Sequence, residues 1–136
     1  MNKIFILFLI FFSFQSYSLE SFKKTIEIKS GSIEFIDKES MIKFIDGVEI
    51  NSEMVNILAI EAIYDDIENT ITMIGNPSEI QSLKESNIFK GYANKIIFYD
   101  DNKIELFGNA YIKYENLSIT SNSIVFNPIT GKISSE

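Results

Sequence analysis

One short pattern recurs four times along this chain of 136 residues: a small residue, an apolar residue three positions later, and usually an aromatic ring two positions after that. The occurrences begin at Ser30, Ala59, Ala93 and Ser121, which lie 29, 34 and 28 residues apart. A near-constant period of this size predicts a repeat architecture, in which each unit buries its apolar face by stacking on its neighbours. We therefore expect four repeats of about 30 residues.

Within each repeat the residues alternate between apolar and polar, as in Ile33-Glu34-Phe35 and Ile104-Glu105-Leu106. This alternation is typical of strands that place one face on a core. Turn residues interrupt it every ~8–14 residues, a spacing that favours an all-β sandwich or barrel. We expect each repeat to be a strand, a turn, a second strand and a Gly-containing corner that folds the chain back. The apolar and aromatic residues of the pattern share the inner face, and the small residue does not.

The first 18 residues differ from the rest and predict an export signal. A short positive start precedes an apolar run, Ile4–Phe12, and a small, polar stretch follows it. A signal-peptide core measures about 7–15 residues, whereas a membrane-spanning helix needs ~20. We expect cleavage after Ser18, which leaves residues 19–136 as one domain exported to a bacterial periplasm. The alternative is a retained membrane anchor.

Composition removes several classes of function. The chain has no Cys, no His and no Arg, and its net charge is −7. It therefore lacks thiol chemistry, the usual general base and the basic surface of a nucleic-acid-binding protein, and we predict neither an enzyme nor a cofactor. Asp65-Asp66 and Asp100-Asp101-Asn102 offer oxygen ligands for Ca²⁺. Asp and Asn are also common in plain turns, which is the interpretation we favour.

The third and fourth occurrences together, Ala93–Ile133, read ANKIIFYDDNKIELFGNAYIKYENLSITSNSIVFNPITGKI. Their order of strand, acidic turn, strand, Gly-Asn, strand and closing Thr-Gly turn resembles the LptA/OstA-like family of periplasmic lipopolysaccharide-transport proteins. Ile60–Ile80 carries the next-best match, and Ser30–Ile50 has Gly47-Val48 in place of Gly-Asn. The resemblance covers about Ile26–Ile133. It implies an open, twisted antiparallel β-jellyroll and no enzymatic activity.

The resemblance also implies a lipid-binding interior for the acyl chains of lipopolysaccharide. The apolar strand positions that would line it are Ile33, Phe35, Ile42, Phe44, Tyr64, Ile71, Met73, Ile96, Phe98, Ile104, Leu106, Ile112, Ile124 and Phe126, with Ala62 among them. The alternative for each of these residues is the packed core of an ordinary sandwich.

The resemblance implies partners that join end to end, namely LptC-like and LptD-like proteins or further copies of the chain. We expect edge strands at Thr25–Lys29 and, at the other end, at 116–126 with 131–135, because unpaired strand edges accept an added strand. A membrane-anchored LptC-like subunit and a ligand-free adaptor that pairs only through its edges are the alternative functions.

Overall fold

The computed structural model describes residues 26–36, 40–83 and 88–135. Every regular element in these ranges is a strand, which confirms the predicted all-β class, and no helix there is long and apolar enough to cross a membrane. The predicted export signal, residues 1–18, lies outside the described residues. The strands are β1 (Glu27–Ile36), β2 (Met41–Asn51), β3 (Val55–Ala59), β4 (Glu61–Asp65), β5 (Thr70–Ser82), β6 (Phe89–Tyr99), β7 (Ile104–Tyr114), β8 (Leu117–Phe126) and β9 (Ile133–Ser135).

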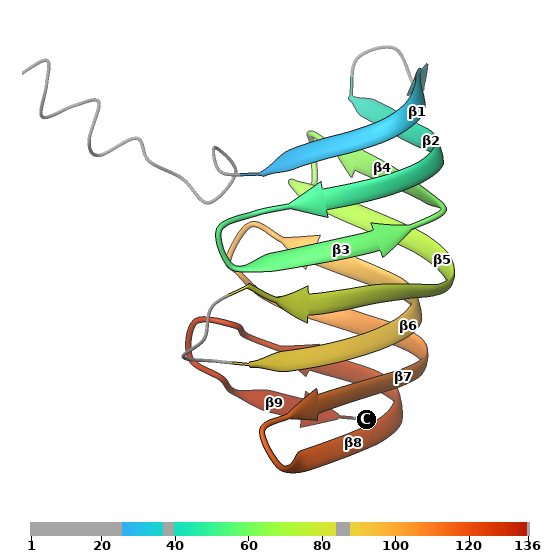
Figure 1. The fold of residues 1–136 in the computed structure, drawn as a ribbon. Helices are drawn as coiled ribbons and strands as arrows, with labels where there is room; N and C mark the ends of the chain where they lie inside the picture. The colour runs from blue at the N-terminus through green and yellow to red at the C-terminus, as the bar shows by residue number, and fades with distance from the viewer. Residues whose placement is uncertain (1–25, 37–39, 84–87, 136) are drawn as a thin grey trace, which may run out of the picture.

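The strands form one antiparallel sheet in which most neighbours in sequence also pair with each other. Its order is β1-β2-β3-β5-β6-β7-β8-β9, and β4 lies beside β2 and β5. The chain therefore advances steadily from the blue end to the red end of the stack (Figure 1). As predicted, β1 is one edge of the sheet, and β8 and β9 form the other end.

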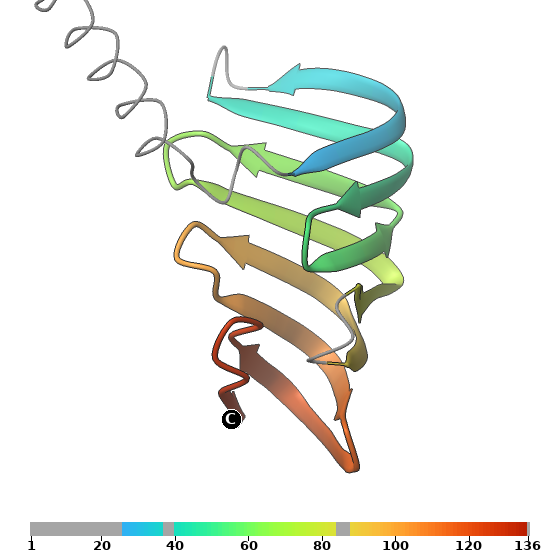
Figure 2. The ribbon, with the colours of Figure 1, turned by 60° about the vertical axis from the view of Figure 1, so that its left-hand side comes forward.

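A crease crosses the sheet and divides it into two arms. The strand pairing slips between Ser30 and Ser32, between Ile74 and Ser78, between Tyr92 and Lys95, and between Phe107 and Ala110. Such bulges bend a strand and increase its twist. Because they occur at one level, the sheet folds over on itself (Figure 2). The first arm holds β3 and the second holds β4, while the long strands contribute to both, and the result is the predicted β-jellyroll.

The predicted Gly corners bend the chain but do not fold it back, so that part of the prediction is wrong. Gly47, Gly75 and Gly108 lie inside β2, β5 and β7, at the crease. Gly47 and Gly108 have φ of 82° and 87°, and Asp46 and Asn109 beside them have φ of 67° and 48°. Gly, Asn and Asp adopt this left-handed conformation most readily, and two such residues in a row turn a strand without ending it.

The small residue of each repeat also lies where we did not expect it. Ser30 pairs with Val48, and Ser78 pairs with Ala93. Val48 is 4% exposed and Ala93 is fully buried, so these positions face inward. The expectation that the small residue points away was wrong because the strand pairing slips at the crease, which interrupts the regular alternation between the two faces.

The two arms pack against each other through interlocking side chains. A Cβ atom added at Gly91 in the first arm would lie only 3.1 Å from Leu106 Cδ2 of the second arm. Phe89 and Phe126 meet edge to face across the arms with ring centroids 4.4 Å apart. The core is therefore built from the inner faces of a single folded sheet.

Replacing Gly108 by Val tests the crease. We expect a loss of about 1–3 kcal/mol in the free energy of unfolding, because a β-branched residue is strained at positive φ and its Cβ would lie 3.0 Å from Asn94 Nδ2. Asn109→Gly is the matched control, since Gly adopts the same conformation without strain. Urea denaturation measures both variants, and equal stability of the two would contradict this account of the crease.

Replacing Leu106 by Ala tests the packing between the arms. Leu106 is fully buried, so we expect a loss of about 2–5 kcal/mol in unfolding free energy. Leu117→Ala removes the same side chain from a position that is 55% exposed, and there we expect a change within about 0.5 kcal/mol. Thermal and urea unfolding give both values, and a small loss for Leu106→Ala would mean that the arms are not tightly packed.

Candidate binding interior

The structure brings almost all the predicted interior residues together as two rows on the inner face of the second arm. Directly paired residues on neighbouring strands point to the same face, so the register defines each row. Row A contains Ile33, Phe44, Ala62, Met73, Ile96, Leu106 and Ile124. Row B contains Phe35, Ile42, Tyr64, Ile71, Phe98, Ile104 and Phe126.

Ile112 is the one predicted residue that lies elsewhere, on the inner face of the first arm. It belongs to a third row, which the prediction otherwise missed: Ile28, Ile50, Ile57, Ile80, Gly91, Ile112 and Ile119. The sequence carries a signal for this row, because Val48-x-Ile50 and Val55-x-Ile57 also alternate. The signal is hard to read because the bulges interrupt the alternation within each strand.

Exposure changes steadily along rows A and B. In the middle and at the β8 end, Met73, Ile96 and Leu106 are fully buried. Towards the β1 end, Phe44 is half-buried, and Ile33 is 56% and Phe35 75% exposed. The interior face therefore continues into solvent at β1, where no further strand covers it within the described part of the chain.

The opposite end of the interior is closed by aromatic side chains. Phe126 is fully buried and meets Phe89 at 4.4 Å and Tyr114 at 6.1 Å between ring centroids. β9 pairs with this end of β8, placing Ile133 opposite Phe126. The interior is therefore open to solvent at the β1 end and closed by packed aromatic side chains at the β8 end.

The interior of this closed structure leaves little empty space. A cavity of about 20 Å³ lies where Ile26, Tyr64, Ile71 and Phe98 meet, which is room for about one water molecule. An acyl chain can therefore reach the buried part of the rows only if the arms separate. At the β1 end it can contact Ile33 and Phe35 without any rearrangement.

Rows A and B contain no charged side chain, and their one polar group stays neutral. Burial, together with a 3.1 Å hydrogen bond from the Tyr64 hydroxyl to Asp66, raises the pKa of Tyr64 above its usual value. The phenol is then protonated throughout the neutral range. The interior face offers apolar surface and no counter-ion, which suits hydrocarbon.

The Asp-rich segments act as turns. Asp65 Oδ1 accepts hydrogen bonds from the backbone amides of Ile67 and Glu68 at 3.0 and 3.1 Å, and Asp101 Oδ1 accepts one from Lys103 at 3.2 Å. These bonds are those expected of Asp in a turn. Across the described residues, no group of three or more acidic side chains is arranged to hold a metal ion.

No protein-family model and no curated protein matches the sequence. A solved structure with a similar fold is LptH of Pseudomonas aeruginosa, described as the LptA-homologous periplasmic component of the conserved lipopolysaccharide transport device. The TM-score is 0.74 with 16% sequence identity, covering 85% of each chain. At this identity the likeness establishes the fold: the chain has the β-jellyroll architecture of LptH.

Proposed function

We propose that this chain is a periplasmic lipopolysaccharide-binding transport protein, which shields acyl chains along its inner face and forms part of a bridge between the two membranes. One observation carries the proposal: rows A and B begin with the exposed side chains of Ile33 and Phe35 and continue unbroken into the interior. The jellyroll shared with LptH supports it.

The physical chemistry of the interior suits this role. Burying acyl chain contributes ~0.8 kcal/mol per CH₂ group, so a few chains bind without any charge pairing. The protein carries a net charge of −7 and a phosphorylated lipid is also anionic, so we expect the headgroup to stay in solvent. Acyl chains enter at the β1 end, and deeper passage requires the arms to separate.

The edges of the sheet supply the proposed contacts with partners. Among the described residues, β1 pairs only with β2, and β9 pairs only with β8. An edge strand presents backbone groups that can pair with an added strand. LptC-like and LptD-like proteins, or further copies of this chain, would extend the stack at these two ends.

Photo-crosslinking in cells tests the proposal. A photoreactive residue is placed at Phe35, at its neighbour Glu34 on the outer face of the same strand, and at buried Phe126. We expect lipopolysaccharide adducts at position 35 and none at position 34, because alternate residues of a strand face opposite sides. Adducts at position 126 would show in addition that the arms separate around the lipid.

The same experiment tests the hypothesis of a ligand-free adaptor. Equal labelling at positions 34 and 35, or none at either in an exported and folded protein, would overturn lipid binding and favour an edge-pairing adaptor.

The N-terminal sequence of the purified protein separates a soluble carrier, cut after Ser18, from a membrane-anchored subunit that retains its first residues.

A further inference from the structure

A second groove lies on the outer face of the first arm, separate from the interior. It measures about 410 Å³ and crosses β3, β5, β6 and β7, a volume in the range of small-ligand sites. The side chains that line it alternate with inward-facing residues: Lys90 and Tyr92 flank Gly91, and Tyr111 and Lys113 flank Ile112. Ile80 and Gly91 of the third row also border the groove, whereas no residue of rows A and B does.

Two lysines lie side by side on adjacent strands of this groove. Lys90 and Lys113 are directly paired on β6 and β7, an arrangement in which like charges repel. The ion pairs among the described residues are Lys29–Glu27 and Lys43–Glu61, so neither groove lysine is neutralised within that part of the chain. The groove is lined by these two lysines and one carboxylate, Glu79, so its formal charge is positive in a protein of net charge −7. This local charge favours an anionic ligand.

The groove also offers apolar surface beside the lysines. Tyr92 and Tyr111 are stacked, with ring centroids 5.0 Å apart and an angle of 23° between the rings. Tyr92 is 43% exposed, and Leu58 on the β3 side of the groove is 44% exposed. An amphipathic molecule can therefore place an apolar face on these side chains while its charged group reaches the lysines.

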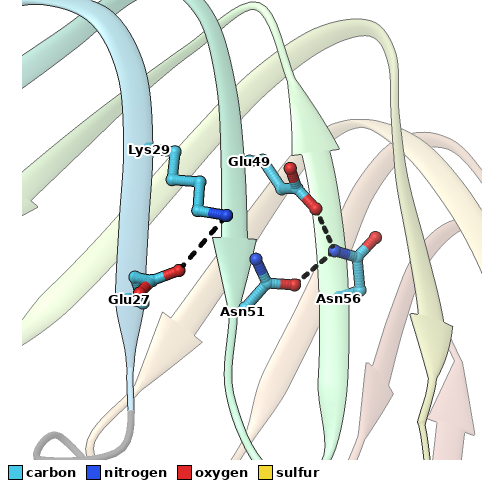
Figure 3. Close-up of polar contacts among 5 residues, drawn as sticks. All are labelled: Glu27, Lys29, Glu49, Asn51 and Asn56. Carbon is cyan, nitrogen blue, oxygen red and sulfur yellow. Dashed lines mark hydrogen bonds and ion pairs between the residues drawn. The ribbon is translucent and has the colours of Figure 1, made fainter.

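A buried amide supplies a fixed polar group at the β3 side. Asn56 is 9% exposed, and its Nδ2 donates to Glu49 Oε2 at 2.9 Å and to Asn51 Oδ1 at 2.6 Å. These bonds use both hydrogens of the amide. Figure 3 shows that the Asn56 carbonyl oxygen points away from both acceptors. It is available as an acceptor, and Glu79 and Gln81 of β5 line the groove beside it.

We propose that this groove binds a phosphorylated saccharide. The phosphate, which carries about −1.5 to −2 charges at pH 7, lies between the ammonium groups of Lys90 and Lys113. The C–H face of the sugar packs on Tyr92 and Leu58, and the hydroxyl groups donate to Asn56 and Glu79. The site does not depend on lipid binding in the interior, and its ligand is either a soluble sugar phosphate or the headgroup of a glycolipid.

Calorimetric titration of the full chain with glucose 1-phosphate tests the site. We expect one binding site, weakened about tenfold or more by Lys90→Gln or Lys113→Gln, since each removes a charge-assisted hydrogen bond. Lys132→Gln, at an exposed lysine outside the groove, should bind as the unchanged protein does. Glucose and inorganic phosphate should each bind about tenfold more weakly or worse, because each lacks half of the contacts.

Three results would overturn the proposal: no binding of glucose 1-phosphate, equal affinity in all three lysine variants, or equal affinity for inorganic phosphate. Amide chemical shifts give a second readout that does not depend on the variants, and they should change at β3, β5, β6 and β7 only. Titration with a phosphorylated glucosamine glycolipid and with its deacylated form then distinguishes a glycolipid headgroup from a soluble sugar phosphate as the ligand. Acyl chains also reach rows A and B in the proposed function, so the two forms are compared by the amide shifts at the groove. If the acylated form changes these shifts at a lower concentration than the deacylated form does, the ligand is a glycolipid headgroup. If it needs the same or a higher concentration, the ligand is soluble.

Discussion

The crease is the constraint on which the rest of this structure depends. A single antiparallel sheet has one apolar face that must be covered, and here the sheet covers itself. Bulges at equivalent places in the strands bend the whole sheet at one level, and left-handed residues such as Gly47 and Gly108 make the bend at low cost. Without the crease, rows A and B would lie on an open, water-exposed surface.

Folding one sheet over itself makes the two ends of the interior different. At the β8 end, Phe89, Tyr114 and Phe126 fill the space between the arms, and β9 pairs with β8 beside Phe126. At the β1 end the rows continue past the covered region to Phe35, which is 75% exposed. The proposed function uses this difference, because it gives hydrocarbon an entrance at one end and a packed barrier at the other.

Much of this could be predicted from sequence, because alternation and a repeated pattern are local signals. The all-β class and the inward positions on the second arm follow from them, the jellyroll was implied by the family resemblance, and the four-repeat count stays a prediction. The direction of the Gly corners was wrong, because a bulge is set by the pairing of two strands. Ile33 and Phe35 are exposed because β1 is an edge strand. The outer groove is lined by residues from four strands, β3, β5, β6 and β7. Neither feature is visible in any one segment.

The rows have a further consequence for how such a protein can change in length. Each of the strands β1, β2, β4, β5, β6, β7 and β8 contributes one residue to row A and one to row B. Neighbouring strands lie about 4.8 Å apart. Inserting a pair of strands would therefore lengthen the apolar track by roughly 10 Å while leaving its width, which the crease sets, unchanged. The length and the width of the apolar track can therefore change independently in this architecture. Duplicating or deleting strands would make the track longer or shorter without redesigning the core.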